Sequence, residues 1–343
     1  MIGDPSGKSK ERNLQTAEGV KENTECIRKQ LEKFIDLSDS NKGEIVNNFD
    51  WLSKINLIDF LRDYGKHFPI NYMLSKEIVA SRLEAGISFT EFSYQILQSI
   101  DFLKLYEDKK CQIQLGGGDQ WGNLTSGLEL IRKVKGPDTP VEVFTANLIT
   151  RSDGKKFGKS EDGALFLNPE LTSPYKLYQY FLNTTDNDAI HYLKVFTFLS
   201  LDEINEISKK HYESLGSFYA QKILAKEVVT TIHGESGAAK AIKMSEALFS
   251  GDIKSLSEEE LEELLLPLKV DVPSNLNVVD LLVAVKAASS KREAREFLTN
   301  GAISLNGEKI GNLELICSAL NALFNKYFVI RRGKKNYFLA KIS

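Results

Sequence analysis

The chain has 343 residues, of which 27% are charged and 42% hydrophobic, a composition typical of a globular protein with two or three domains. Its three cysteines and four histidines lie far apart in the sequence, which excludes a disulfide framework and argues against a metal site. No apolar run approaches the length of a membrane span and no signal-peptide core opens the chain, so we expect a cytoplasmic protein that does not enter membranes.

The net charge of −3 conceals an uneven distribution. From Lys286 to the C-terminus there are eleven Lys or Arg residues and four Glu residues, a net charge of +7, which leaves −10 for the rest of the chain. A basic C-terminal region on an acidic body indicates contact with nucleic acid. The alternative is a solvated basic surface that binds nothing.

Hydrophobic periodicity divides the chain into regions. Helical patterns at residues 16–37, 51–64, 72–86 and 90–105 precede a strand from Cys111, a helix at 124–134 and a strand at 141–150. This αβαβ order predicts an α/β domain with a doubly wound parallel sheet, which we assign to residues 1–165. Residues 166–267 read as consecutive helices. They end in the acidic segment SEEELEELLL, for which we expect a linker.

Residues 276–343 predict a small α+β domain. An apolar helix at 278–287 precedes a helix that opens at Ser290 with capping-box spacing and closes at Asn300-Gly301. Asn306-Gly307 is a two-residue hairpin signal, and a second hairpin has the cationic tip RRGKK. Exposed cations of this kind suit the phosphate backbone of RNA.

The segment QIQLGGGDQWGN, residues 112–123, begins as an apolar strand and continues into three glycines and a polar group. Three successive glycines are unfavourable in a strand or helix, because glycine loses the most conformational freedom on ordering. They suit backbone that approaches a ligand closely, and open α/β sheets bind ligands beyond the carboxyl ends of their strands. The alternative is a turn that opens the following helix, with Asp119 or Asn123 as its N-cap.

A second glycine-rich segment, SDGKKFGKS at 152–160, nearly matches the phosphate-binding pattern G-x-x-x-x-G-K-[ST]. Its glycines are one residue too close, and no helix is expected directly after it, so we reject a P-loop. We expect Lys155, Lys156, Lys159 and Ser160 to form a cationic loop instead. Such a loop would close over a polyphosphate and neutralise the charge that develops on leaving pyrophosphate.

Together these segments resemble the bacterial-type tyrosyl-tRNA synthetases, a family of class I aminoacyl-tRNA synthetases. The resemblance covers essentially all 343 residues and rests on GDPSGK, FTEFSYQILQSID, QLGGGDQWGNLTSGLELIRK, KFGKS, SPYKLYQYF, EALFSGDI and IRRGKKNY. The tryptophanyl family shares the general plan, but Tyr94, Gln98 and Asp101 and the C-terminal RNA-binding domain favour the tyrosyl family. The resemblance implies a Rossmann-like catalytic domain, an α-helical anticodon-binding-type domain and a C-terminal RNA-binding domain similar to that of a ribosomal small-subunit protein.

The implied activity is the ATP-dependent conversion of tyrosine to tyrosyl-adenylate and transfer of the tyrosyl group to tRNA(Tyr), with Mg²⁺ accompanying ATP and no tightly bound cofactor. The implied tyrosine ligands are Asp4, Tyr94 and Gln98 for the α-amino group, Asp101 for the phenol hydroxyl and Gln120 for the carboxyl group. Gly117 and Asp119 would contact the adenylate and its ribose, and Lys159 would also contact ATP. The implied catalytic residues around the pyrophosphate are Lys156, Lys159, Ser160, Lys8 and Arg12.

The RNA-binding residues that the resemblance implies are Lys291, Arg292, Arg295, Arg331, Arg332, Lys334 and Lys335. The segment Ile87–Phe92, with Phe89 at its centre, resembles the dimer interface of the family and implies a homodimer. Each residue also has a structural interpretation. Asp119 could cap a helix, Tyr94 and Gln98 could pack in a core, and Lys8 and Arg12 could be solvated.

The sequence departs from the family pattern in one respect. An H-x-G-H signature that stabilises the ATP phosphates in the family is absent, and none of the four histidines has a partner at that spacing. We expect an initiation codon assigned at an internal methionine or a truncated gene, and a polypeptide with impaired catalysis and reduced stability. Two interpretations stay open: a tyrosine–tRNA ligase, and a non-catalytic RNA-binding remnant or regulatory paralogue of the same family.

Overall fold

The computed structural model describes residues 2–6, 13–38, 43–80, 82–84, 86–154, 157–160, 163–333 and 336–342. The side chains of residues 77–78, 159–160 and 163 lie outside that description. The chain divides into two compact units, residues 1–159 and 160–343, and each is considered by itself. None of the helices in the described ranges is long and apolar enough to cross a membrane.

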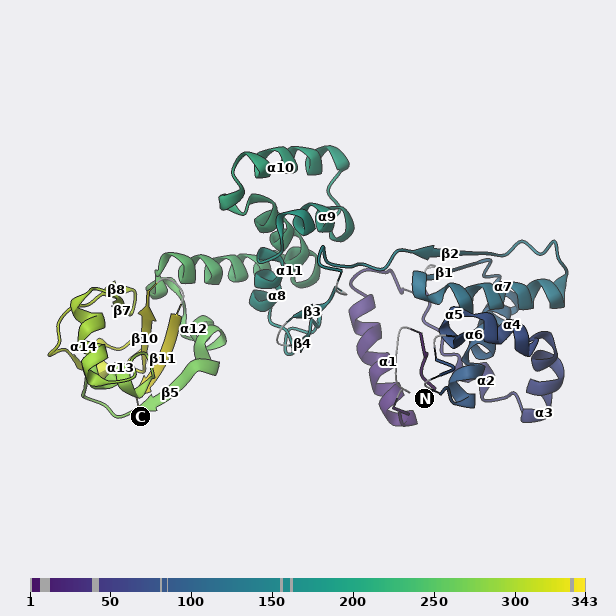
Figure 1. Ribbon diagram of the computed structural model, residues 1–343, viewed down its shortest axis with the longest axis horizontal. Helices are drawn as coiled ribbons and strands as arrows, with labels where there is room; N and C mark the ends of the chain where they lie inside the picture. Colours follow the sequence, from purple (N-terminus) through teal and green to yellow (C-terminus); the bar gives the residue numbers. More distant parts are fainter. Residues whose placement is uncertain are drawn as a thin grey trace. The chain divides into compact units, whose positions relative to one another are not determined.

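The N-terminal unit is mostly helical (Figure 1). Its helices are α1 (Ala17–Leu31), α2 (Phe49–Leu52), α3 (Leu57–Asp59), the π-helix η1 (Phe60–Tyr64), the short helix η2 (Gly65–His67), α4 (Ile70–Ser75), α5 (Glu77–Ala80), α6 (Phe89–Lys109), the 3-10 helix η3 (Gly118–Gln120) and α7 (Trp121–Lys135). Its strands are β1 (Ile113–Gly117) and β2 (Glu142–Ala146). The helix predicted at 51–64 is interrupted because Asn56 has an extended backbone and its side chain accepts a hydrogen bond from the Asp59 N–H, which starts α3 anew.

Strands β1 and β2 pair in parallel, with Ile113 opposite Glu142 and Gly117 opposite Ala146. They are joined through α7, as parallel strands require a crossover, so the predicted parallel α/β order is confirmed. Buried residues of α6 and α7 share a hydrophobic cluster with Val141, and Val143 of β2 packs against it.

The other face of the described strand pair is exposed. Ile113, Leu115 and Phe144 are 58%, 72% and 53% exposed. Leu115 and Phe144 lie opposite each other in the ladder, so they share this face. In parallel α/β sheets both faces are ordinarily covered, which makes this apolar surface unusual.

The C-terminal unit contains a helical region and a mixed sheet (Figure 1). Its helices are α8 (Pro174–Leu182), α9 (Asp186–Phe196), α10 (Leu201–Glu213), η4 (Leu215–Ser217), α11 (Tyr219–Ser250), η5 (Ile253–Ser255), α12 (Glu258–Leu265), η6 (Leu266–Leu268), α13 (Val278–Ala284), α14 (Lys291–Thr299) and η7 (Ala319–Asn321). Its strands are β3 (Lys159–Ser160), which begins at the boundary, β4 (Gly163–Ala164), β5 (Lys269–Val272), β6 (Leu276–Asn277), β7 (Ile303–Leu305), β8 (Glu308–Lys309), β9 (Ile316–Cys317), β10 (Tyr327–Arg332) and β11 (Asn336–Ile342).

The main sheet of this unit has the strand order β5-β11-β10-β7-β8. The hairpin predicted at Asn306-Gly307 joins β7 and β8, and the predicted second hairpin joins β10 and β11 in an antiparallel pair. Strand β5 pairs in parallel with β11, so residues 269–272, which lie between the predicted domains, belong to this sheet. The division into three domains stays a prediction.

The sheet is apolar on both faces. In β10, Phe328 and Ile330 lie in the cluster formed with α13 and α14, whereas Tyr327 and Val329 lie in a second cluster with the end of α11 and with α12. This alternation follows from the period of two along a strand. Figure 1 shows α12 and the pair α13–α14 on opposite sides of β10 and β11.

The linker predicted for the acidic segment at 257–266 is wrong, because these residues form α12 and close the second cluster. A capping box between Ser257 and Glu260 starts the helix. Leu261 and Leu265 are 0% and 3% exposed and pack against the sheet. Several of the acidic side chains are paired, for example Glu260 with Lys243 at 2.7 Å.

Candidate active site

The glycine-rich segment folds back on itself at the end of β1. A Cβ on Gly116 would lie 3.0 Å from Cβ of Gln120, and one on Gly117 would lie 2.8 Å from Oδ1 of Asp119. The glycines therefore allow η3 to turn closely against the strand before α7 begins. The N-cap of α7 is Gln120, which makes no side-chain capping bond, so the alternative with Asp119 or Asn123 as N-cap is wrong.

Asp4 and Gln120, which are 116 positions apart, are brought together. Nε2 of Gln120 donates a hydrogen bond to Oδ2 of Asp4 at 2.6 Å. Oδ1 of Asp4 accepts from the backbone N–H of Ser6 at 2.9 Å and from its hydroxyl at 2.6 Å. Nδ2 of Asn123 lies 3.3 Å from Oε1 of Gln120 and 3.5 Å from Oγ of Ser6. Four polar side chains thus connect the N-terminal segment to the start of α7.

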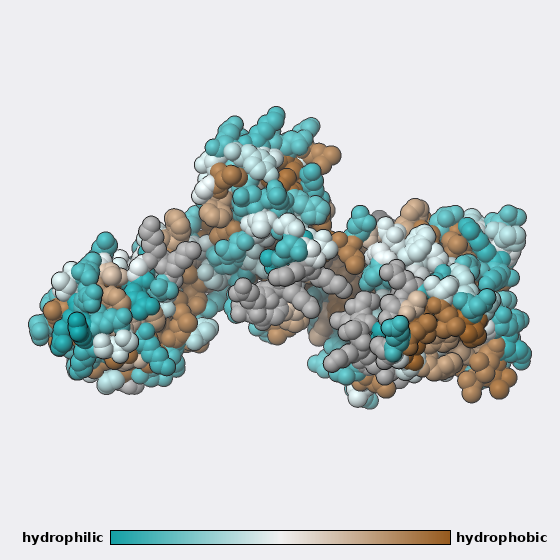
Figure 2. All heavy atoms as spheres, in the orientation of Figure 1, coloured by the Kyte–Doolittle hydropathy of each residue, from teal (hydrophilic) through white to brown (hydrophobic). Residues whose placement is uncertain are grey.

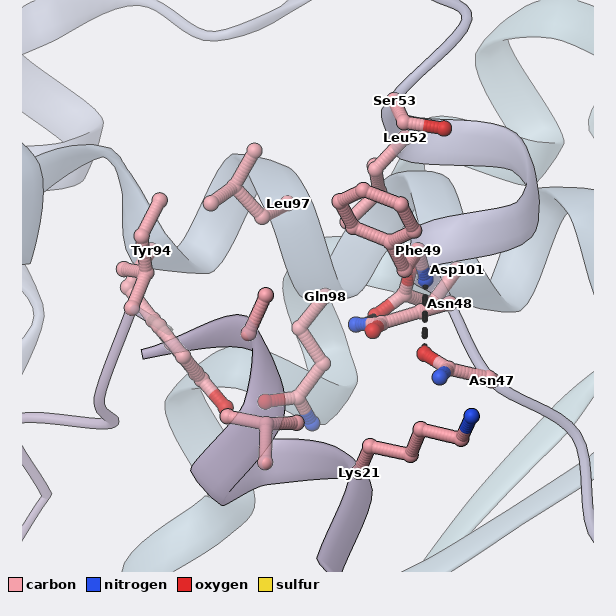
Figure 3. A pocket seen from close by; sticks show the side chains of 13 residues that line it. Lys21, Asn47, Asn48, Phe49, Leu52, Ser53, Tyr94, Leu97, Gln98 and Asp101 are labelled. Atoms are coloured by element: carbon pink, nitrogen blue, oxygen red, sulfur yellow. Dashed lines mark hydrogen bonds between the residues drawn. The ribbon is translucent and has the colours of Figure 1, made fainter. Parts of the chain in front are cut away.

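Tyr94, Gln98 and Asp101 line one cavity of about 600 Å³. They lie on one face of α6, as their spacing predicts. The cavity is completed by a set of residues from the N-terminal segment, α1 and the region of α2: Ile2, Ala17, Val20, Lys21, Asn47, Asn48, Phe49, Leu52 and Ser53, together with Leu97 of α6. Figure 3 shows Tyr94 and Gln98 extending into the same space, with Lys21 across from them.

Ile2 lines this cavity, whereas Asp4 and Gln120, the other two predicted tyrosine ligands, do not. The described residues therefore hold the five predicted ligands in two groups, one in the cavity and one at the junction of β1 and α7. Figure 2 shows apolar side chains gathered over part of the N-terminal unit around α2 and α6.

Asp101 is half-buried and has two donors. Nε1 of Trp51 donates to its Oδ1 at 2.8 Å, and Nδ2 of Asn48 donates to its Oδ2 at 3.0 Å. Burial raises the pKa of Asp101, and the hydrogen bonds from Asn48 and Trp51 partly offset that rise. Sequence reasoning missed both donors, because they lie about 50 positions before Asp101 and no motif connects them.

The predicted phosphate-binding residues are largely outside the described ranges. Lys8, Arg12 and Lys156 fall outside them, and for Lys159 and Ser160 only the backbone, in β3, is described. Gly117 and Asp119 are half-buried at the end of β1 and in η3. Among the described residues, no three His, Cys, Asp or Glu side chains are grouped so that they could hold a metal ion.

The predicted RNA-binding residues differ in how freely they face solvent. Arg292 and Arg295 are exposed on α14. Lys291 is exposed as well and pairs with Asp280 at 2.6 Å.

The two arginines of β10 are half-buried. Arg331 lies 5.5 Å from the Tyr337 ring, and Arg332 donates to the carbonyl of Ala287 at 2.6 Å. Lys334 and Lys335 are outside the described ranges. Among the predicted RNA-binding residues that the structure describes, those on α14 are therefore the most accessible to solvent.

Comparison with known proteins covers nearly the whole chain. Residues 1–250 match the family of tRNA synthetases class I (W and Y), and residues 266–340 match the Tyrosine--tRNA ligase SYY-like C-terminal domain. The chain is 51% identical over 340 residues to the Tyrosine--tRNA ligase of Listeria welshimeri, covering 98% of this chain and 81% of that protein. It is also 51% identical over 343 residues to the Tyrosine--tRNA ligase of Staphylococcus carnosus, covering 99% and 81%.

A solved structure agrees with this similarity. The C-terminally truncated mitochondrial tyrosyl-tRNA synthetase of Aspergillus nidulans matches with a TM-score of 0.60 and 30% identity, covering 72% of this chain and 73% of that one. The family match extends over 250 of the 343 residues, and the chain covers 81% of the length of the Listeria welshimeri ligase. The chain therefore belongs to the tyrosine–tRNA ligase family of class I aminoacyl-tRNA synthetases.

Proposed function

We propose that this chain activates tyrosine with ATP and transfers the tyrosyl group to tRNA(Tyr). The observation that carries the proposal is the pairing of Asp101, a half-buried carboxylate in a cavity of about 600 Å³, with two hydrogen-bond donors that orient it. An oriented acceptor that lines a cavity suits the hydroxyl of a phenol. A bound phenylalanine would leave that acceptor without its donor, which is how such a site selects tyrosine.

The second group of ligands suits the amino-acid end of the substrate. The carboxylate of Asp4 carries the charge opposite to that of the α-ammonium group. We assign Tyr94 and Gln98, which line the cavity beside Asp101, to the same ammonium group. Gln120 presents Nε2, which can donate to a carboxyl oxygen. In the activation step a carboxylate oxygen of tyrosine attacks the α-phosphorus of ATP, and the bond to pyrophosphate breaks.

The phosphate part of the reaction is assigned to the cationic loop. We assign the leaving pyrophosphate to Lys156, Lys159, Ser160, Lys8 and Arg12, and the adenylate to Gly117 and Asp119. Mg²⁺ enters with ATP as part of the substrate. In the second step a ribose hydroxyl at the 3′ end of tRNA attacks the activated carbonyl and AMP leaves.

For the RNA partner, we assign phosphate contacts first to Arg292 and Arg295, because they are exposed on one helix of a region with net charge +7. A homodimer is supported by exposed apolar side chains in the N-terminal unit, since Phe89 is 72% and Leu57 70% exposed. We assign the chain to the cytoplasm, because tRNA and ATP are used there and because its three cysteines are free.

One observation favours reduced activity in the 343-residue polypeptide. The exposed face of β1 and β2 leaves Ile113, Leu115 and Phe144 in water, directly before the glycine turn that carries Asp119 and Gln120. A strand pair that is covered on one face only holds the ends of its strands loosely, and small displacements of catalytic groups lower rates strongly. The same observation supports the alternative of a non-catalytic RNA-binding protein of this family.

Tyrosine-dependent ATP–pyrophosphate exchange tests the proposal. We expect exchange by the 343-residue polypeptide that requires tyrosine and is slower than that of the Listeria welshimeri ligase measured beside it. Exchange as fast as that ligase would contradict the expected impairment. Binding of tRNA without any tyrosine-dependent exchange, at the highest attainable protein concentration, would contradict the ligase function and support the alternative.

A further inference from the structure

The hydrogen bonds around Asp4 form a directed network. A carboxylate accepts hydrogen bonds and has no proton to donate, so Gln120 must present Nε2, not Oε1, to Asp4. Oε1 of Gln120 therefore points away, toward Nδ2 of Asn123 at 3.3 Å. The chemistry of the four groups, and not the shape of the amide alone, decides this orientation.

Ser6 is oriented in the same way. Its hydroxyl proton goes to Oδ1 of Asp4 at 2.6 Å, so its oxygen is left to accept from Nδ2 of Asn123 at 3.5 Å. Asn123 thus donates to both Gln120 and Ser6, and both of these donate to Asp4. All the bonds run in one direction, from Asn123 to Asp4.

Burial gives the network its strength. Asn123 and Ser6 are 3% and 6% exposed, so water does not readily replace a bond that is lost. Asn123 is not needed to cap α7, whose N-cap is Gln120. A buried amide in the first turn of a helix is costly unless its polar atoms are used, and here the use is to orient two other side chains.

We propose that Asn123 is a positioning residue for the amino-acid end of the substrate. It fixes the amide of Gln120 with Nε2 toward Asp4 and the hydroxyl of Ser6 toward Asp4, and so orients the Asp4 carboxylate for the α-ammonium group. The inference rests on the proposed function for the role of Asp4 and Gln120, but the network itself is a property of the free chain.

The substitution Asn123→Asp tests the direction of the network, because it keeps the shape of the side chain and replaces the donor by an acceptor. Oε1 of Gln120 would then face a carboxylate, and the amide would have to turn away from Asp4. Asn123→Leu removes the donor without adding a charge, in case the buried carboxylate prevents folding. Asn23→Asp is the matched control, since exposed Asn23 donates to Oε1 of Gln15 at 3.4 Å.

Two measurements are made on the 343-residue polypeptide. The first is the solvent-exchange rate of the Gln120 side-chain amide protons by NMR, with the signal assigned by its loss in Gln120→Glu. We expect exchange about tenfold faster in Asn123→Asp, the equivalent of one lost hydrogen bond, a smaller increase in Asn123→Leu and no change in Asn23→Asp.

The second measurement is the affinity for tyrosine and for phenylalanine by calorimetry. We expect Asn123→Asp to weaken both by about tenfold and to leave their ratio unchanged, because Asn123 acts on the end that both amino acids share. A role confined to folding would change the ratio as well, since Asp101 would also be displaced.

Several results would overturn the inference. Unchanged Gln120 exchange in both Asn123 variants refutes the network whether or not tyrosine binds. Faster exchange with unchanged affinity refutes the positioning role. If the Gln120 amide protons of the wild-type chain exchange more slowly than those of the Asn123 variants but the chain binds no tyrosine, the proposed function is refuted, and with it the role given to Asn123.

Discussion

Replacing Leu261 by alanine should loosen the cluster that α12 forms on one face of the C-terminal sheet, and the effect can be measured at Cys317 on the other face. Leu261 of α12 is 0% exposed and packs with Tyr327 and Val329. Cys317 is 2% exposed in the opposite cluster, with Phe328. If α12 and the sheet unfold together, Leu261→Ala costs about 2–5 kcal/mol of stability and raises the opening equilibrium that exposes Cys317 by about 30- to 4,000-fold.

The assay is alkylation of the thiols with iodoacetamide at pH 8, followed for each cysteine by mass spectrometry. Burial raises the pKa of Cys317 to about 11, so its native thiol reacts slowly and labelling reports opening. Exposed Cys26 serves as the internal reference. The control is Leu266→Ala, because Leu266 is 46% exposed and its truncation should cost less than about 0.5 kcal/mol.

A wild-type rate of Cys317 labelling in Leu261→Ala, with the stability of α12 clearly reduced, would refute the reasoning. It would mean that the C-terminal sheet folds without α12 and that the second cluster is a contact between separate domains. Faster labelling in Leu266→Ala as well would point to a general effect of truncation in this segment and would equally contradict the assignment.

Three further results are expected. Trp51→Phe removes a bond that lowers the pKa of Asp101, so the pH profile of tyrosine binding should move to higher pH; an unchanged profile would contradict that role. A chain ending at Ser250 should lose most tRNA affinity and keep tyrosine binding in filter and calorimetric assays, whereas loss of both would contradict separate sites. The hydrogen bond to Glu262, together with burial, raises the pKa of Tyr327 to about 12. Tyr327→Phe should therefore lower the free energy of unfolding by about 1 kcal/mol below pH 10, and this difference from the wild type should vanish as pH rises through 12. A stability difference that does not depend on pH would refute this role of the hydrogen bond.

Local signals predicted much of the fold. The spacing of Tyr94, Gln98 and Asp101 placed them on one face of a helix, and Asn306-Gly307 specified its hairpin, because both depend on neighbours a few positions away. The acidic residues of α12 were misread because their partners are remote: Glu263 pairs with Lys240 at 2.7 Å, 23 positions earlier. Seen without those partners, a run of glutamates resembles a solvated linker.

The candidate site was predicted only in part, for the same reason. The family resemblance supplied Asp4 and Gln120, but the donors that orient the ligands come from elsewhere in the chain. Trp51 reaches Asp101 across 50 positions, and Ser6 reaches Asn123 across 117. Such bonds depend on packing between elements, which periodicity and turn chemistry do not encode.

The most direct test of the account is competition between tyrosine and phenylalanine for the 343-residue polypeptide and its Asp101→Ala variant. The wild-type chain should bind tyrosine more tightly than phenylalanine, because only tyrosine supplies a donor to the Asp101 carboxylate. In the variant that preference should fall by about tenfold or more, while phenylalanine affinity changes little. Equal preference for tyrosine in both proteins, or no preference in the wild type, would contradict the central claim that Asp101 reads the phenol hydroxyl.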